Sequence, residues 1–374
     1  SKLGIELFVL DDGWFGERNN DDCSLGDWFV NEEKLKGGLN SLATDINKMG
    51  MQFGLWFEPE MISPKSKLYE EHPDWCIHID GRIRSEARKQ LILDLSRDEV
   101  CEAVIKMITD VLKSAPISYV KWDMNRNMTE IGSTAWPAKK QKEIAHRYML
   151  GLYKILENIT SNFPNILFES CSGGGGRFDG GMLYYMPQTW TSDDTDAIER
   201  LMIQEGTSLV YPTSSMGSHV SAVPNHQVHR ITPLNTRGVV AMAGSFGYEL
   251  DVTKMNEEEK EEVKKQVEFY KNIRSTVQFG DLYRLKSSFD SNEAAWMNLS
   301  KDGKEVVVSY VKKYAEANVI PRRLKVKALD ENSLYEVIET GEVFGGDELM
   351  YIGLEIGELM GDYQAKNWTL RKVD

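Results

Sequence analysis

The sequence predicts an α/β domain of repeated βα units, followed by a smaller antiparallel β domain. Short apolar segments alternate with longer stretches of helical periodicity over residues 1–280, as in parallel sheets whose strands are joined by helices. After about Gly280, β-branched runs alternate with polar residues and are joined by Asp-Gly and Gly-Gly turns, which is typical of antiparallel strands. The predicted domains are therefore a barrel-like domain over 1–280 and a β domain over 281–374.

Eight segments of the first domain have the length and apolar composition of buried strands. They are Ile5–Leu10, Phe53–Phe57, Leu91–Leu95, Ser118–Trp122, Ile166–Glu169, Pro187–Thr191, Ser208–Tyr211 and Ala241–Phe246. In the second domain we predict strands over Lys304–Lys312, Leu324–Ala328 and Leu334–Ile338. No helical pattern separates these last three.

Capping signals and apolar periodicity predict three helices. Ser96-Arg-Asp-Glu99 is typical of a capping box before an apolar face. A second helix is expected over Lys139–Ser161, and a third over Asn256–Gln278, acidic early and basic later as the helix dipole prefers. The apolar positions of the second helix are Ile144, Tyr148, Leu152, Ile155 and Ile159.

Composition excludes several classes of partner. The chain has 374 residues, of which 41% are hydrophobic and 27% are charged, as in ordinary globular proteins. Its formal net charge of −14 would repel a phosphate backbone or an anionic membrane surface. No apolar stretch approaches the roughly 20 residues that span a bilayer. We therefore expect neither a nucleic-acid partner nor a membrane partner.

Four cysteines, Cys23, Cys76, Cys101 and Cys171, lie far apart and form no Cys-x-x-Cys pair. This spacing argues against a zinc ribbon or a disulfide framework and is compatible with a reducing compartment. The chain begins at Ser1 and shows no signal-peptide pattern there. We therefore expect a cytoplasmic protein whose native N-terminus lies before Ser1.

Several predicted strands end in acidic, basic or aromatic residues, at the sheet edge where parallel-sheet enzymes bind their substrates. The segment Ser118–Trp122 contains Lys121 and runs into Asp123, Asn125 and Arg126. Other strands end in Asp11-Asp12-Gly13-Trp14, Trp56-Phe57-Glu58-Pro59-Glu60, Glu169-Ser170-Cys171 and Trp190-Thr191-Ser192-Asp193. Carboxylates accept hydrogen bonds from hydroxyls, and indoles cover the apolar face of a pyranose ring. The pattern therefore favours a sugar-binding barrel.

Asp123 and Asp193 follow different strands of the predicted barrel, so both would face the same opening. Two carboxylates are the minimum for glycoside hydrolysis, because one attacks or activates water and the other protonates the leaving oxygen. Lys121 should keep Asp123 ionised, which suits a nucleophile.

Each motif also has a simpler interpretation. Asp11-Asp12-Gly13 is compatible with a plain turn, and Trp14, Trp56 and Trp190 with core aromatics. The glycines Gly173–Gly176 lack the spacing of a phosphate loop, and we expect them to let the backbone approach a ligand closely. A loop holding His219, His226 and His229 leaves a metal site as an alternative.

Taken together, the motifs resemble those of bacterial α-galactosidases of glycoside hydrolase family 36, the melibiase and raffinase type. The resemblance covers essentially the whole chain. It rests on Leu10-Asp-Asp-Gly-Trp-Phe-Gly16, Gly54-Leu-Trp-Phe-Glu-Pro-Glu60, Lys121-Trp-Asp-Met-Asn-Arg126, Cys171-Ser-Gly-Gly-Gly-Gly-Arg-Phe-Asp179, Trp190-Thr-Ser-Asp-Asp-Thr-Asp196 and Gly217-Ser-His-Val-Ser-Ala-Val-Pro-Asn-His226.

This resemblance implies a retaining double displacement on α-galactosides such as melibiose and raffinose, without cofactor or metal. Asp123 is implied as the nucleophile and Asp193 as the acid and base. Like charges on Asp194 and Asp196 would raise the pKa of Asp193 for that task. The implied substrate-binding residues are Asp11 and Asp12 at the 4- and 6-hydroxyls, Trp56 beside the ring, Arg88, Lys121 and Asn125 around it, and Cys171 and Gly173 by the 2-hydroxyl.

The resemblance also implies a (β/α)8 TIM-type barrel that lacks its first strand in this chain, followed by an antiparallel β-sandwich. The segment Leu91–Leu95 would then leave the barrel, and seven barrel strands would remain. A missing N-terminal domain and a homo-oligomeric intact protein are expected. The alternatives are a galactoside-binding fragment without turnover, a galactosyl-transferring enzyme or an α-N-acetylgalactosaminidase.

Overall fold

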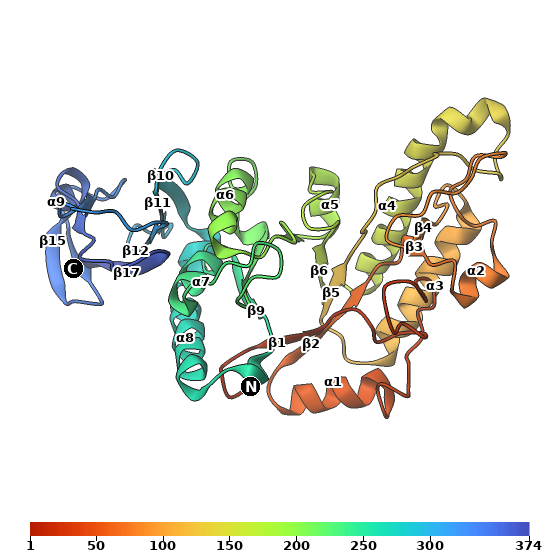
Figure 1. Cartoon of the computed structure of the whole chain (residues 1–374), viewed down its shortest axis with the longest axis horizontal. Helices are drawn as coiled ribbons and strands as arrows, with labels where there is room; N and C mark the ends of the chain where they lie inside the picture. Colours follow the sequence, from red (N-terminus) through yellow and green to blue (C-terminus); the bar gives the residue numbers. More distant parts are fainter. Residues whose placement is uncertain (374) are drawn as a thin grey trace. The chain divides into compact units, whose positions relative to one another are not determined.

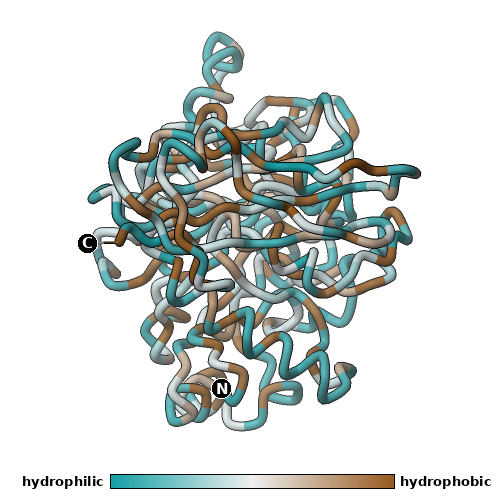
Figure 2. The backbone as a smooth tube through the Cα atoms, turned by 90° about the vertical axis from the view of Figure 1, so that its left-hand side faces the viewer, coloured by the Kyte–Doolittle hydropathy of each residue, from teal (hydrophilic) through white to brown (hydrophobic). Residues whose placement is uncertain are grey.

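The computed structural model describes residues 1–373, which form two compact units. The first unit is Ser1–Thr189, and the second begins at Trp190; Figure 1 labels their helices and strands. No helix within residues 1–373 is long and apolar enough to cross a membrane. Accordingly, the brown hydrophobic segments in Figure 2 are short and alternate with teal ones.

The first unit is built on five parallel strands, hydrogen-bonded in the order β1-β2-β5-β6-β7. Their bounds are Leu7–Leu10 (β1), Gln52–Phe57 (β2), Tyr119–Trp122 (β5), Leu167–Ser170 (β6) and Gln188–Trp190 (β7). The helices are α1 (Gly38–Lys48), α2 (Lys67–Glu71), α3 (Asp98–Ser114), the 3-10 helix η1 (Ala138–Glu143), α4 (Ile144–Asn162) and α5 (Gly180–Tyr185). The predicted βα units are therefore confirmed here.

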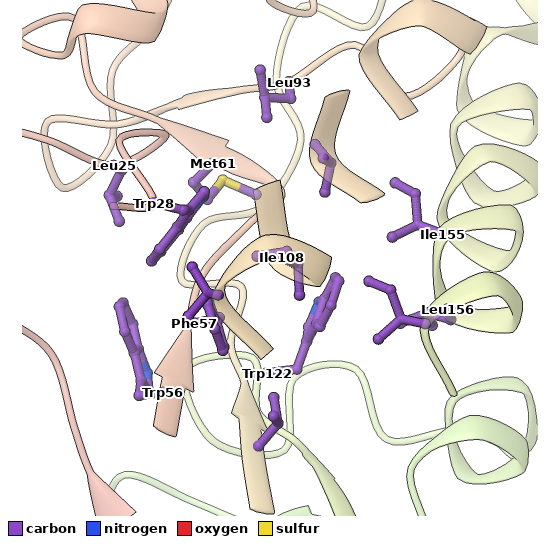
Figure 3. Packing of buried hydrophobic residues seen from close by; sticks show 14 of the residues in the cluster. Leu25, Trp28, Trp56, Phe57, Met61, Leu93, Ile108, Trp122, Ile155 and Leu156 are labelled. Atoms are coloured by element: carbon purple, nitrogen blue, oxygen red, sulfur yellow. The ribbon is translucent and has the colours of Figure 1, made fainter. Parts of the chain in front are cut away.

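Apolar side chains from the strands and helices fill the core of the first unit. Val104 and Ile108 of α3 are buried, as are all five apolar positions predicted on α4. Each fully buried aliphatic side chain contributes about 1.5–3 kcal/mol to folding. In Figure 3, Trp122 of β5 lies beside Ile155 and Leu156 of α4. The side chain that directly precedes Asp123 is thus fixed in the core.

The second unit begins with helices and strands of the same βα type. They are α6 (Ala197–Thr207), the 3-10 helix η2 (Thr213–Ser215), β8 (Met216–Ser221), α7 (Leu234–Ala241), β9 (Ser245–Glu249), the 3-10 helix η3 (Val252–Lys254) and α8 (Glu257–Phe279). β8 and β9 pair in parallel. With the five strands of the first unit, seven strands belong to the parallel sheet, as expected for this chain.

An antiparallel sheet follows α8 in the second unit. Its six strands are ordered β10-β11-β12-β17-β14-β15, and β13 pairs separately with β16. The bounds are Asp281–Lys286 (β10), Glu293–Leu299 (β11), Glu305–Lys312 (β12), Arg323–Leu324 (β13), Leu334–Val337 (β14), Glu342–Gly345 (β15), α9 (Gly346–Tyr351), Leu354–Glu355 (β16) and Gln364–Val373 (β17). The antiparallel strands predicted after α8 are confirmed as a sheet.

The expected departure of Leu91–Leu95 from the barrel is confirmed, whereas the predicted strand Ser208–Tyr211 is wrong. Leu91–Ile92 forms β4, which pairs antiparallel with β3 (Met61–Ile62) and lies outside the parallel sheet. Ser208–Tyr211 is a turn after α6, and Leu209 and Val210 are exposed. The strand of this region is β8, which buries Gly217, Ser218 and Ser221 rather than a run of large apolar residues. Hydrophobicity alone therefore pointed to the wrong segment.

The predicted capping box of α3 is also wrong. Arg97 occupies the N-cap position and makes no side-chain capping bond. The hydroxyl of Ser96 donates instead to Asp94 Oδ1 over 2.5 Å. A capping box does begin α8. The Asn256 side chain accepts from the Glu259 N–H, and the Glu259 side chain accepts from the Asn256 N–H. The expected helix over Asn256–Gln278 is confirmed.

Candidate active site

Strand register brings three chemistry-bearing residues to one edge of the first unit's sheet. Phe57 of β2, Trp122 of β5 and Ser170 of β6 are aligned. The residues that follow them are Glu58, Asp123 and Cys171. The Asp123 N–H donates to Phe57 O over 2.7 Å, and the Cys171 N–H to Trp122 O over 2.8 Å. All three leave the sheet at its carboxyl edge, where ligands bind in parallel sheets.

Asp123 lies at the centre of this edge and is 6% exposed. Its Oδ2 accepts hydrogen bonds from Trp56 Nε1 over 3.1 Å and from Asn125 Nδ2 over 2.8 Å. Its Oδ1 accepts from the Met124 N–H over 2.8 Å. Three donors aimed at one carboxyl suit its ionised, acceptor-only form, which is the form a nucleophile needs.

Lys121 forms its ion pair with Asp11, at 3.0 Å between Nζ and Oδ2. Burial opposes its charge, but attraction to Asp11 first, and then to groups including Asp123, raises the pKa of Lys121 above its usual range. Lys121 is therefore held as a cation by its contact with Asp11. Asp11 is the ion-pair partner of Lys121, and the charge of Asp123 adds to the rise in the pKa of Lys121.

Asp12 is exposed and is held by a residue that the sequence analysis missed. Arg18 donates to it from Nε over 3.0 Å and from a terminal nitrogen over 2.8 Å. This two-point arrangement fixes a carboxylate in orientation as well as in position. The pair Asp11 and Asp12 is therefore held by two cations, which a plain turn does not require.

The glycine loop after β6 contacts the turn that carries Asp123. The Gly173 N–H donates to Asn125 Oδ1 over 3.1 Å, and the Ser172 hydroxyl donates to Met124 O over 2.9 Å. Gly173 and Gly174 have φ values of 52° and 87°, which favour glycine. At Gly176, an added Cβ would lie 2.6 Å from Ser172 O. The loop thus depends on glycine for its path.

Cys171 is buried beside the same carboxylate. Burial first, and then the charge of Asp123, raises the pKa of the Cys171 thiol well above its usual range. A thiol that stays protonated here is unreactive and polar enough to contact a hydroxyl.

Trp56 serves both the site and the core. Its ring stacks with Phe15 at 6.2 Å between centroids, while its Nε1 faces Asp123. Trp14 is fully buried and donates from Nε1 to Trp56 O over 2.9 Å. Trp14 is therefore the core aromatic of the simpler interpretation, and Trp56 reaches the sheet edge.

Arg88 lies in the loop between α2 and β4, with a φ of 52° and half of its side chain exposed. One guanidinium nitrogen lies 3.8 Å from Asp21. Its charge also acts on Glu58, where it opposes the rise in the pKa of that carboxyl. This places Arg88 near the edge formed by Glu58, Asp123 and Cys171.

Glu58 and Glu60 were quoted in the motifs but not predicted as site residues. Glu60 is fully buried and binds Arg177 through both oxygens at 2.7 and 2.9 Å, and it also accepts from Trp122 and Tyr148. Despite burial, these partners lower its pKa. Burial raises the pKa of Glu58 to about 8, and the charge of Asp123 adds to the effect. The sequence feature that could have identified both residues is the Glu-Pro-Glu run directly after β2.

Asp193 belongs to the second unit and is exposed. Its Oδ1 accepts a hydrogen bond from Trp190 Nε1 over 3.1 Å. Asp196 caps α6 and pairs with Arg230. The Arg230 guanidinium therefore offsets the charge of Asp196.

The histidines of the second unit do not converge. The His219 ring packs against Trp190 at 4.7 Å between centroids, and His226 and His229 are exposed. Within residues 1–373, no group of three or more histidine, cysteine, aspartate or glutamate side chains could hold a metal ion. The histidine loop thus gives the metal alternative no donor set.

Comparison with known proteins agrees with these motifs. Residues 1–280 match the melibiase family model, and residues 293–370 match the glycosyl hydrolase family 36 C-terminal domain. The chain is 62% identical over 373 residues to alpha-galactosidase AgaA of Geobacillus stearothermophilus, covering 100% of this chain and 51% of the relative. It is 52% identical to alpha-galactosidase Mel36A of Lactobacillus acidophilus, with the same two coverages.

Solved structures show the same fold. A crystal structure of a variant of AgaA in complex with raffinose superposes with a TM-score of 0.98 at 61% identity, covering 100% of this chain and 52% of that one. The alpha-galactosidase from Lactobacillus brevis gives 0.97 at 46% identity, covering 100% and 51%. The chain thus spans about half the length of the relatives it matches. From the family models over both of its parts, the chain belongs to the melibiase family, glycoside hydrolase family 36.

Proposed function

We propose that the protein containing this chain is a retaining α-galactosidase, which releases terminal α-D-galactose from oligosaccharides such as melibiose and raffinose. The observation that carries the proposal is the buried Asp123 carboxylate, oriented by Trp56, Asn125 and the Met124 N–H at the sheet edge. Named relatives that cover the whole chain are alpha-galactosidases, and related structures hold raffinose or stachyose.

In the proposed first step, Asp123 attacks the anomeric carbon while Asp193 protonates the glycosidic oxygen, so that the aglycone leaves. In the second step, Asp193 takes a proton from water, which displaces Asp123 and releases galactose with its configuration retained. Two variants of AgaA that bind raffinose or stachyose each carry one replaced aspartate. Those aspartates are separated along that chain by as many positions as Asp123 and Asp193 are here.

The remaining residues are proposed to bind the galactose ring. Asp11 and Asp12, each held by a cation, would accept hydrogen bonds from the 4- and 6-hydroxyls. Trp56 would flank the ring, and Arg88, Lys121 and Asn125 would surround it. Cys171 and Gly173 would contact the 2-hydroxyl, whose hydrogen bonds strengthen in the transition state.

Turnover and covalent labelling test the proposal together. We expect a 2-fluoro α-galactosyl fluoride to label the peptide that contains Asp123, as mass spectrometry would detect. We expect Asp123→Asn to abolish both this labelling and the hydrolysis of an aryl α-galactoside. Labelling of another carboxylate, or hydrolysis by Asp123→Asn at the parent rate, would remove Asp123 from the nucleophile role.

Binding without turnover is not favoured, since the relatives named above are enzymes. Two further expectations accompany the proposal. If the intact protein is a homo-oligomer, its mass in solution will be a multiple of the mass of one full-length subunit. A cytoplasmic location accords with four cysteines that form no disulfide in residues 1–373.

A further inference from the structure

Glu58 is a buried carboxyl beside the proposed nucleophile, and the double displacement assigns it no task. It follows β2 directly and is 1% exposed. Its Oε1 accepts the Asn125 N–H over 2.6 Å, and its Oε2 accepts from Gln90 Nε2 over 3.3 Å. Within the described residues it forms no ion pair, so its burial is not offset by a direct countercharge.

The bond to Asn125 matters because Asn125 connects three parts of the site. Its Nδ2 donates to Asp123 Oδ2, and its Oδ1 accepts the Gly173 N–H. Glu58 therefore fixes the backbone of the residue whose side chain orients both the nucleophile and the glycine loop. Displacement of Asn125 would disturb both at once.

The charges around Glu58 determine its ionisation state. Burial raises its pKa to about 8, and the negative charge of Asp123 adds to the rise. Hydrogen bonds from Asn125 and the charge of Arg88 oppose it, and the charge of Arg18 also interacts with it. With its pKa raised to about 8, Glu58 keeps its proton at pH 6.

We propose that Glu58 is a positioning residue, which holds the turn from Asp123 to Asn125 as a neutral carboxyl and adds no second negative charge beside the nucleophile. This inference rests on the proposed function, because it assigns Glu58 to the reaction of Asp123. Glu60 provides the contrast, since it is two residues away and equally buried but ion-paired with Arg177.

Two substitutions distinguish the hydrogen bond between Glu58 and the Asn125 N–H from the ionisation of Glu58. Glu58→Gln keeps an acceptor oxygen for the Asn125 N–H but cannot ionise, whereas Glu58→Ala removes the acceptor. The measurements are kcat and KM for an aryl α-galactoside between pH 5 and 9, made on the protein containing this chain. Asp27→Asn is the matched control, because Asp27 is another buried carboxyl with a pKa raised by burial. Its side chain accepts from the backbone N–H groups of Lys67 and Leu68, in the first turn of α2.

We expect Glu58→Gln to keep kcat at pH 6 within about threefold of the parent, and Glu58→Ala to lose about 10²-fold in kcat with little change in KM, as for a small misplacement of reacting groups. Above pH 8, kcat of the parent should fall more steeply than that of Glu58→Gln, because only the parent gains a charge beside Asp123. Asp27→Asn should keep the parent's pH profile.

Thermal unfolding gives a readout that does not depend on turnover. Between pH 4.5 and 8 the unfolded chain loses the Glu58 proton while the folded chain keeps it, so this group lowers stability as pH rises. Relative to the parent, Glu58→Gln should therefore gain stability across that window. A flat difference would overturn the neutral state of Glu58.

Kinetic outcomes are equally decisive. Parent-like kcat in Glu58→Ala, or equal losses in Glu58→Gln and Glu58→Ala at pH 6, would overturn the positioning role. A parent protein without turnover would instead overturn the proposed function, and with it any role of Glu58 in that reaction. These failures are distinguished by the parent's activity alone.

Discussion

Asp123 and Asp193 each accept a hydrogen bond from a tryptophan indole, and the bonds from Trp56 and Trp190 are both 3.1 Å long. An indole N–H is a donor only, so it orients a carboxylate without adding charge. The two aspartates differ in exposure, since Asp123 is buried and Asp193 is open to solvent. A buried nucleophile and an exposed acid that exchanges protons with water suit the two proposed roles.

Replacement of Asp193 by alanine should affect substrates according to their leaving groups. A sugar leaving group needs protonation, so turnover of melibiose should fall about 10²–10⁴-fold. A nitrophenyl leaving group needs little protonation, and its release should fall far less. Steady-state kinetics on both substrates checks this prediction.

The control for this comparison is Asp110→Asn, which alters an exposed carboxylate of α3 that pairs with Lys106. It should leave the ratio of the two rates near that of the parent. Equal losses on both substrates in Asp193→Ala would assign the proton transfer to another group.

At the scale of elements, Glu60 ties four segments of the first unit together. Its carboxylate follows β2 and binds Trp122 of β5, Tyr148 of α4 and Arg177 of the glycine loop. Arg177 is itself mostly buried. The loop that bears Gly173 is therefore anchored through an ion pair in the core rather than at the surface.

Arg177→Met should destabilise the protein by about 3–5 kcal/mol, because it leaves the Glu60 charge buried without its partner. The matched control is Lys106→Met, which breaks the exposed pair with Asp110 and should cost at most about 0.5 kcal/mol. Urea unfolding of both variants measures the difference. Similar losses in the two variants would contradict the anchoring role of Arg177.

The order of elements was largely predictable from sequence, whereas their pairing was not. Apolar runs located β2 and β5, and periodicity located α4 and α8. Leu91–Leu95 has the composition of a strand of the parallel sheet, yet its first two residues pair with β3. An apolar composition does not specify which strand a segment pairs with. β8 was not predicted, because it buries small polar residues such as Ser218 in place of an apolar run.

The candidate site divides in the same way. Asp11, Asp12 and Asp123 could be found because polar residues at strand ends are conspicuous. Arg18 and Glu58 were not predicted, since their contacts form only when loops fold onto the sheet edge. The partner of Lys121 was equally hidden, because Asp11 is distant in sequence and aligned only through strand register.

Over the whole molecule, the formal charge of −14 acts on charged partners and leaves neutral ones unaffected. A galactoside carries no net charge, so the long-range field of the protein should neither attract nor repel it. Asp11 and Asp12 lie in direct contact with Lys121 and Arg18. Salt weakens the interaction of two charges in contact less than it weakens one between charges farther apart than the Debye length.

We therefore expect kcat/KM for a neutral aryl α-galactoside to change by less than about twofold between 50 and 500 mM sodium chloride, because the substrate carries no charge that salt could screen. Steady-state kinetics at constant pH checks this expectation. A systematic decline with salt would show that exposed ion pairs at Asp11 or Asp12 open under these conditions.

The three donors around Asp123 have a consequence for the reaction's activation entropy. A free carboxylate rotates about its Cβ–Cγ bond and presents either oxygen, whereas this one has both oxygens engaged from fixed directions. Folding has thus already removed rotational freedom that a flexible nucleophile would lose at the transition state. The arriving sugar meets an attacking group whose line of approach is set in advance.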